Sequence, residues 1–340
     1  MNHILKPLLT ITTCVGITLN ASGKLRETEL IVTASDGVKM GATLTEPDSS
    51  TRLRGAIVLA TGSGTQNRDE ELFGKKPFKT IAEYLTPLGY AVLRVDDRGL
   101  FDPEEKRTAT LQTYADDVAA AVTLTDSLFP TTPIGIIGHS AGGTYALING
   151  THNPKVKFIV TLAGPAWSGD SIVMAQSRAI ATQMTGKWDA EERQRRLLQT
   201  AKSSLPETTA RLMMTMILNE SVDKETASLP QVIRYFQQEI DAMLSPWYRS
   251  FLRYEPADDI KNIKIPALAL IGSKDLQVPS ANLTTINTIN PDINTQIMDG
   301  HNHLFQKCVT GLTDEYATLP GDISDETLTA ISLWLDEILP

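Results

Sequence analysis

The chain is short of several features that mark particular protein classes. Its 340 residues include two cysteines, Cys14 and Cys308, too few for a framework of disulfides or a cysteine-rich zinc site. Acidic residues outnumber basic ones by 40 to 31, which gives a formal charge of −9. A nucleic-acid-binding protein needs a basic face to neutralise phosphates, so we expect no nucleic-acid partner.

The sequence also lacks the apolar run of about 18 residues that a membrane-spanning helix requires, so we expect no stable membrane insertion. What is present is a mixed composition, 41% apolar and 21% charged, which is typical of a chain that folds around a large core. The length suits one large α/β domain with an insertion.

Residues 1–23 have the pattern of a secretory signal peptide. Lys6 precedes an uncharged stretch at residues 8–19, and Ala21-Ser22-Gly23 supplies the small residues of a cleavage site. Threonines dilute the apolar stretch, so a flexible cytosolic leader is the alternative. We expect an exported protein, either periplasmic or secreted.

Strand and helix patterns alternate through most of the remaining chain. A hairpin is expected at residues 30–46, where Ser35-Asp36-Gly37 forms a turn signal. Further strands are predicted at residues 55–60, 90–95, 134–137, 156–162, 266–271 and 295–298, and helices at 78–88, 111–128, 142–148 and 324–338. This alternation predicts an α/β fold whose mostly parallel sheet is covered by helices on both faces. The core would comprise residues 24–164 and 257–340.

Residues 165–256 break this alternation, with helical patterning and no convincing strand. The segment holds six of the nine methionines and three of the four tryptophans. One interpretation is a helical subdomain in which these side chains fill its own core. The other is a helical cap insertion, in which some of them line an apolar pocket over an active site. The two interpretations are compatible.

Gly138-His139-Ser140-Ala141-Gly142 lies between an expected strand and an expected helix. This is the G-x-S-x-G pattern in the context that a nucleophile elbow requires. Ser140 would occupy a sharp turn, and glycine at 138 and 142 would remove the side chains that clash there. The turn also directs the Ala141 amide, at a helix N-terminus, toward a developing oxyanion. We expect Ser140 to be a nucleophile, and His139 to be directed away from it.

Other segments accompany this turn: GSGTQNRDE at 62–70, KPF at 76–78, DDRG at 96–99, LAGP at 162–165, GSKDLQVP at 272–279 and NHLFQ at 302–306. Together with the elbow they resemble the α/β-hydrolase superfamily over nearly all of the chain, closest to a bacterial branch of esterases and serine aminopeptidases. The resemblance implies an eight-stranded sheet and a catalytic triad in the order serine, aspartate, histidine.

The residues agree with that order. Asp275 follows a predicted strand, where the acid of such a triad is found, although an ordinary turn aspartate is the alternative. His303 lies 28 residues later in a polar loop and precedes Leu304-Phe305, as in the similar family. His301 is the competing candidate for the base.

The oxyanion hole needs a second amide from the loop after the strand at 55–60, where small residues let the backbone approach a substrate. By resemblance, Ser63 supplies it, together with Ala141. The charged run at 67–70 could order this loop through ion pairs or could be a solvated cluster.

These residues predict a serine hydrolase that cleaves small-molecule carboxylic esters through an acyl-enzyme intermediate, without a metal or organic cofactor. An aminopeptidase or amidase, or a thioesterase, could use the same triad, and a non-catalytic binding protein could use the same scaffold. An acidic pocket for a substrate amine would favour the aminopeptidase. The insertion offers Asp170, Glu220 and Glu239 for that role.

Overall fold

The protein is described here by a computed structural model that covers residues 25–339. The predicted signal segment at residues 1–23 lies outside the described residues and stays a prediction. Within the described part of the chain, no helix is both long and apolar enough to cross a bilayer.

Eight strands form one sheet in the order β1-β2-β4-β3-β5-β6-β7-β8. Their bounds are β1 Leu25–Thr33, β2 Lys39–Pro47, β3 Gly55–Ala60, β4 Tyr90–Val95, β5 Ile134–His139, β6 Val156–Leu162, β7 Ala267–Gly272 and β8 Asn294–Met298. β2 pairs antiparallel with β1 and β4, and every other neighbouring pair is parallel. The predicted mostly parallel, eight-stranded sheet is therefore confirmed.

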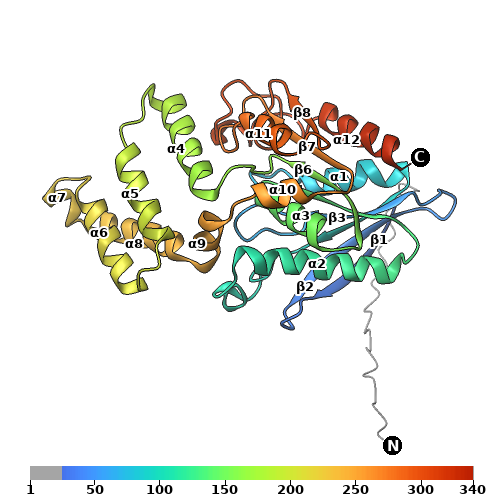
Figure 1. Ribbon diagram of the computed structural model, residues 1–340, viewed down its shortest axis with the longest axis horizontal. Helices are drawn as coiled ribbons and strands as arrows, with labels where there is room; N and C mark the ends of the chain where they lie inside the picture. The colour runs from blue at the N-terminus through green and yellow to red at the C-terminus, as the bar shows by residue number, and fades with distance from the viewer. Residues whose placement is uncertain (1–24, 340) are drawn as a thin grey trace, which may run out of the picture.

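Helices cover both faces of this sheet (Figure 1). Successive residues of β3 show the two layers, because side chains of a strand alternate between the faces. Ala56 and Val58 pack in the cluster that includes helices α2, α3, α10 and α11, whereas Ile57 and Leu59 pack in the cluster that includes α1 and α12. The bounds of these helices are α1 Pro77–Leu85, α2 Leu111–Leu128, α3 Ala141–His152, α10 Ala257–Asn262, α11 Ala281–Ile289 and α12 Asp325–Ile338.

Six more helices lie between β6 and β7 in the chain, and Figure 1 shows them to one side of the sheet. We call residues 165–256 the helical segment. Its helices are α4 Gly169–Thr185, α5 Glu191–Lys202, α6 Glu207–Asn219, α7 Lys224–Ala227, α8 Pro230–Leu244 and α9 Pro246–Arg253. It has buried apolar side chains of its own, among them Leu197, Met214 and Ile240.

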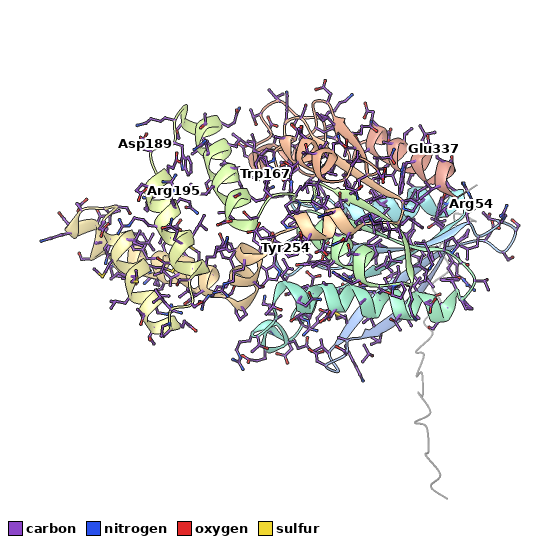
Figure 2. The ribbon with its side chains drawn as sticks, viewed as in Figure 1. Arg54, Trp167, Asp189, Arg195, Tyr254 and Glu337 are labelled. Atoms are coloured by element: carbon purple, nitrogen blue, oxygen red, sulfur yellow. The ribbon has the colours of Figure 1, made fainter. Side chains whose placement is uncertain are left out.

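Two aromatic residues fix the ends of the helical segment to the core (Figure 2). Trp167 precedes α4 and donates a 2.8 Å hydrogen bond from Nε1 to Oγ1 of Thr285 on α11. Tyr254 follows α9, and its hydroxyl donates a 2.6 Å hydrogen bond to the Asp259 carboxylate on α10. A side-chain hydrogen bond therefore holds each end of the helical segment against the core.

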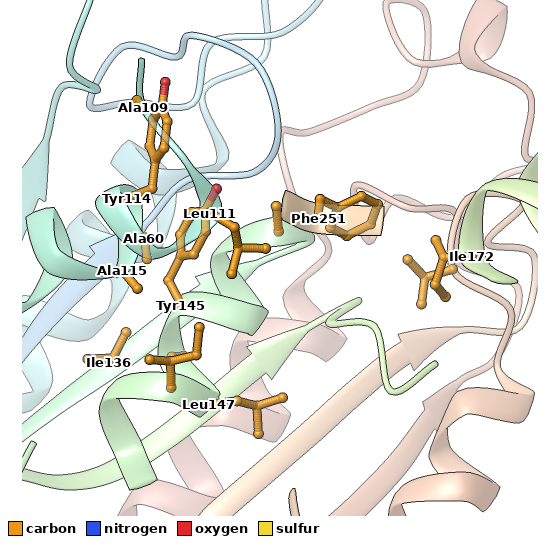
Figure 3. Packing of buried hydrophobic residues seen from close by; sticks show 14 of the residues in the cluster. Ala60, Ala109, Leu111, Tyr114, Ala115, Ile136, Tyr145, Leu147, Ile172 and Phe251 are labelled. Atoms are coloured by element: carbon orange, nitrogen blue, oxygen red, sulfur yellow. The ribbon is translucent and has the colours of Figure 1, made fainter. Parts of the chain in front are cut away.

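The buried cluster that includes α2 and α3 contains a pair of stacked tyrosines (Figure 3). Tyr114 of α2 and Tyr145 of α3 have ring centroids 5.9 Å apart, and the rings are nearly parallel. The Tyr145 hydroxyl accepts a 2.8 Å hydrogen bond from Nε1 of Trp247 on α9. A residue of α3, the helix that begins at the elbow, thus contacts the helical segment directly.

One predicted helix differs from the structure. The pattern at residues 78–88 predicts one helix, whereas α1 ends at Leu85 and a 3₁₀ turn, η1 (Thr86–Leu88), completes the connection. Pro87 lies inside that turn, and proline has no backbone N–H with which to continue the hydrogen bonds of an α-helix. Two further 3₁₀ turns are η2 (Pro103–Lys106) and η3 (Thr313–Glu315).

Candidate active site

Ser140 occupies a strained turn between β5 and α3. Its φ of 52° and ψ of −119° lie in a region that residues with a side chain rarely adopt. The turn is held because the Ser140 amide donates a 2.8 Å hydrogen bond to the carbonyl oxygen of Leu162 at the end of β6. This backbone geometry is the one expected of a nucleophile elbow.

The two glycines of the elbow leave no room for a side chain. A methyl group at position 138 would lie 2.1 Å from the carbonyl oxygen of Gly142. A methyl group at position 142 would lie 2.0 Å from the carbonyl oxygen of Ala60, at the end of β3. Glycine at Gly138 and Gly142 therefore lets the first turn of α3 pack directly on the neighbouring strand.

Asp275 lies just after β7, in the turn that follows the strand. Its Oδ1 atom accepts hydrogen bonds from the amides of Gln277 and Val278, at 2.8 and 2.9 Å. Its Oδ2 atom accepts a 2.8 Å hydrogen bond from Nδ1 of His303. Asp275 is therefore both a turn aspartate and the hydrogen-bond partner of His303. The backbone amides of the turn hold its carboxylate in place for the imidazole.

The ring contacts of the described histidines distinguish the candidates for a base. His301 is buried, and its two ring nitrogens contact the Asp299 carbonyl oxygen and the Ser324 hydroxyl, each at 2.8 Å. Both ring nitrogens of His139 are also engaged. His152 is exposed and pairs with Asp259. His303 is buried, yet its Nε2 makes no hydrogen bond to a described residue, so this nitrogen is available to accept a proton.

His303 lies next to the elbow, because its ring centroid is 4.7 Å from that of His139, the residue before Ser140. The Ser140 hydroxyl forms no hydrogen bond with any described residue, the His303 imidazole included. In enzymes without substrate the contact between nucleophile and base is often long and shortens in the complex. The structure thus joins Asp275 to His303 directly and places the His303 ring next to that of His139, the residue before Ser140.

Two backbone amides near Ser140 are available to a ligand. Ala141 is the first residue of α3, where an amide has no partner within the helix. Ser63 lies in the loop after β3, and both residues line the same cavity as Ser140. Neither amide donates a hydrogen bond to another described residue. Donors placed in this way can stabilise negative charge on a bound oxygen.

A half-buried aspartate, Asp97, holds the loop that carries Ser63. Its Oδ1 accepts a 2.6 Å hydrogen bond from the Thr61 hydroxyl, and its Oδ2 accepts a 2.8 Å hydrogen bond from the Gln66 amide. Burial raises the pKa of Asp97 to about 7, although these two hydrogen bonds oppose the shift. The loop is therefore fixed at residues before and after Ser63.

The charged run at residues 67–70 forms ion pairs, which settles the choice left open by the sequence. Arg68 donates hydrogen bonds to both carboxylate oxygens of Asp96, at 3.1 and 2.7 Å. Asp69 pairs with Arg94 of β4. Each of these contacts joins the loop to the sheet, so the run orders the loop.

Glu70 contacts the elbow itself. Its Oε1 atom accepts a 2.8 Å hydrogen bond from the Gly62 amide and lies 2.8 Å from Nδ1 of His139. Burial alone would lower the pKa of His139, but the charge and hydrogen bond of Glu70 raise it above the ordinary value. The sequence predicted neither this pair nor its contact with Gly62. The only signal was that Glu70 lies in the segment GSGTQNRDE and His139 in the G-x-S-x-G pattern.

A cavity of about 740 Å³ opens above Ser140, between the sheet and the helical segment. One face of α4 lines it along almost the whole helix, at Ile172, Val173, Gln176, Ser177, Ile180, Ala181, Met184 and Thr185. The spacing of four residues keeps these side chains on one stripe, roughly 20 Å long at 1.5 Å per residue. Trp188, Trp247, Tyr248 and Phe251 add aromatic walls.

The charges around this cavity are few. Among the described residues that line it, none is acidic, and Arg193 is the single charged side chain. No group of three or more His, Cys, Asp or Glu side chains in the described part of the chain is arranged to hold a metal ion. The site therefore consists of a serine at a strained turn, an aspartate–histidine pair, two available amides and a cavity of mixed, largely uncharged lining.

Known proteins match this chain in family and in fold. The model of the serine aminopeptidase S33 family matches residues 75–306, while no curated protein sequence is significantly similar. An esterase of Pyrococcus furiosus is 16% identical, with a TM-score of 0.55 over 98% of this chain and 99% of its own.

Two further solved structures have similar folds. An esterase of Thermogutta terrifontis is 16% identical, with a TM-score of 0.52 over 92% of this chain and 99% of its own. A bromoperoxidase of Bacillus anthracis is 15% identical, with a TM-score of 0.51 over 91% and 99%. Since these proteins carry different names for their activities, their likeness shows the fold alone. By its family match, the chain belongs to the serine aminopeptidase S33 family and is a hydrolase of the α/β-hydrolase fold.

Proposed function

We propose that the protein is a serine hydrolase that cleaves carboxylic esters with an extended apolar acyl group. The observation that carries this proposal is the 2.8 Å hydrogen bond between Asp275 and His303, beside the turn that presents Ser140 to an apolar cavity. In this role His303 takes the proton of the Ser140 hydroxyl as its oxygen attacks the acyl carbon. Asp275 holds the imidazole in the required tautomer and stabilises the imidazolium that forms.

The amides of Ser63 and Ala141 would receive the oxygen of the tetrahedral intermediate, each contributing about 2–4 kcal/mol to transition-state stabilisation. His303 then gives its proton to the leaving alcohol as the acyl-enzyme forms. A water molecule resolves the acyl-enzyme, with His303 again as the base, and Ser140 recovers its proton. The reaction needs only these groups and water.

The chemistry of the cavity supports an uncharged acyl group over an aminoacyl group. A substrate with a free amine needs a carboxylate near its nitrogen, and no acidic residue lines the cavity. Asp170 pairs with Lys202, and Glu220 pairs with Arg196. Burial raises the pKa of Glu239, which also lies outside the cavity lining. None of the three carboxylates that the sequence offered for an amine therefore lines the cavity beside Ser140.

In this proposal the helical segment is a cap that supplies one wall of the acyl site. The stripe on α4 and Ser140 line the same cavity, and the length of the stripe suits an acyl chain that extends from the scissile bond. Cavities of this volume and lining commonly bury most of a small-molecule ligand.

The test compares hydrolysis rates for aryl esters of increasing acyl length, a thioester of the preferred acyl group, and aminoacyl anilides. We expect kcat/KM to rise with acyl length and the aminoacyl anilides to be hydrolysed at least about 100-fold more slowly than the best ester. The Ser140→Ala variant is the control and should lose turnover while its thermal unfolding changes little. A preference for aminoacyl anilides would contradict the ester assignment, and turnover retained by Ser140→Ala would contradict the nucleophile.

A further inference from the structure

The buried pair formed by Glu70 and His139 lies at the centre of the site but takes no part in the proton transfers above. Relative exposure is 1% for Glu70 and 5% for His139. The pair connects three parts of the site, which are the loop after β3, the loop that carries His303 and the elbow, to which His139 itself belongs. Oε1 of Glu70 contacts the Gly62 amide, in the loop that carries Ser63. Nε2 of His139 lies 2.9 Å from the backbone carbonyl oxygen of His303.

The partners of His139 determine where its protons are. A backbone carbonyl oxygen can only accept, so Nε2 must carry a hydrogen and donate it to His303. Oε1 of Glu70 already accepts from the Gly62 amide, a contact that favours a carboxylate. One further proton is needed between Nδ1 and this oxygen, and it belongs on the imidazole, which is the more basic group. Both ring nitrogens of His139 then donate hydrogen bonds.

We propose that Glu70 and His139 form an imidazolium–carboxylate pair that positions the catalytic loops, a role that rests on the proposed function. The imidazolium holds the backbone of His303, the carboxylate holds Gly62, and the peptide link to Ser140 connects both to the elbow. Glu70 and His139 are positioning residues, since both ring nitrogens of His139 and Oε1 of Glu70 already contact protein atoms.

The charge of the pair is essential to this role. A neutral imidazole carries one hydrogen and can donate to only one of its two acceptors. Loss of the proton would therefore release either the His303 carbonyl or the Glu70 carboxylate. The groups that face the pair are Asp275 and His303 on the side of the base and Asp97 on the side of Glu70. The Asp275 carboxylate favours the cation, whereas a charged histidine at position 303 would oppose it. A charged Asp97 would oppose the negative charge of Glu70.

The Glu70→Gln variant tests the proposal with little change of shape. The amide oxygen still accepts from Gly62 and His139, but the negative charge is lost, so burial favours the neutral imidazole. We expect kcat for an aryl ester to fall roughly 10- to 100-fold at about pH 8 with KM nearly unchanged, because displaced catalytic groups slow the chemical step. The deficit should shrink as the pH is lowered and His139 regains its second proton.

Glu71→Gln is the matched control. Glu71 is the next residue, lies half exposed, and contacts Asn67 and Lys76 on the surface. This variant should keep the kcat and the pH profile of the unchanged protein. A pH-independent deficit in Glu70→Gln, or no deficit, would overturn the positioning role.

Nitrogen NMR of the protein labelled in its histidine rings tests the pair without a substrate or a variant. At about pH 9, well above the ordinary histidine pKa of about 6.5, one histidine should remain protonated on both ring nitrogens. That signal should become neutral in Glu70→Gln. If every ring is neutral at that pH, the imidazolium pair is refuted, whether or not the protein hydrolyses esters. If the pair is present and no ester is cleaved, it is the proposed function that fails.

Discussion

Replacing Gly142 by alanine tests whether the elbow depends on close backbone packing. The new methyl group would lie 2.0 Å from the Ala60 carbonyl oxygen and 2.7 Å from that of Thr61. Carbon and oxygen atoms rarely approach closer than about 3.3 Å, so one backbone must move by roughly 1 Å. Both belong to rigid elements, and overpacking of this kind costs about 1–3 kcal/mol of unfolding free energy.

The same displacement moves Ser140 and the Ala141 amide relative to Ser63. A shift of about 1 Å at reacting groups can lower the rate roughly 100-fold. Gly150→Ala, in the same helix α3, is the control because its methyl group would meet side-chain atoms of Ile263 and Ile159 at 3.0 to 3.3 Å. Alanine is also favoured over glycine inside a helix by about 1 kcal/mol.

Urea unfolding and aryl ester hydrolysis measure both effects. Gly142→Ala should be less stable than the unchanged protein and nearly inactive when folded, whereas Gly150→Ala should keep its activity and its stability within about 1 kcal/mol. If Gly142→Ala were as stable and active as Gly150→Ala, the steric explanation of the elbow would be wrong.

Four further substitutions test the roles of individual side chains. His303→Ala should abolish ester hydrolysis, whereas His301→Ala should lose about 1–3 kcal/mol of stability, measured by urea unfolding, and keep activity when folded; the reverse pattern would exchange the two assignments. The pKa of Asp97 is about 7 in the folded protein, above the ordinary 3.8, so between these pH values the folded protein binds one proton more than the unfolded chain. The free energy of unfolding therefore declines as the pH rises through this range, by up to about 1.4 kcal/mol per pH unit. Urea unfolding of Asp97→Asn from about pH 4 to 7 should lack that decline, and an unchanged pH slope would show that the carboxyl is ionised throughout. Ile180→Trp should lower kcat/KM about tenfold for long acyl esters and little for acetyl esters, and an equal effect on both would remove α4 from the acyl site.

The sequence predicts the sheet well because its central strands are buried on both faces. The runs at 55–60 and 156–162 coincide with β3 and β6, since such strands need continuous apolar residues. The elbow was predictable because only glycine at positions 138 and 142, on either side of Ser140, permits the packing that the structure shows. Asp275 was found from its place after a strand.

Other features depend on contacts that no local pattern encodes. Glu70 and His139 are 69 residues apart, and their pairing requires the loop after β3 to close over the elbow. The sequence indicates that the His139 side chain is directed away from Ser140, but not that its two nitrogens join the loops on either side. The stripe on α4 also escapes prediction, because Gln176, Ser177 and Thr185 interrupt its apolar character and the orientation of the helix is set by anchors such as Trp167 and Thr285.

The most direct measurement is labelling with a fluorophosphonate, followed by mass analysis of the peptides. The reagent forms a stable bond with a serine only where a neighbouring base makes the hydroxyl a nucleophile. We predict one label per chain, on Ser140, and its loss in His303→Ala. A label on another residue, or no label on a folded and soluble protein, would contradict the assignment of Ser140 as the nucleophile.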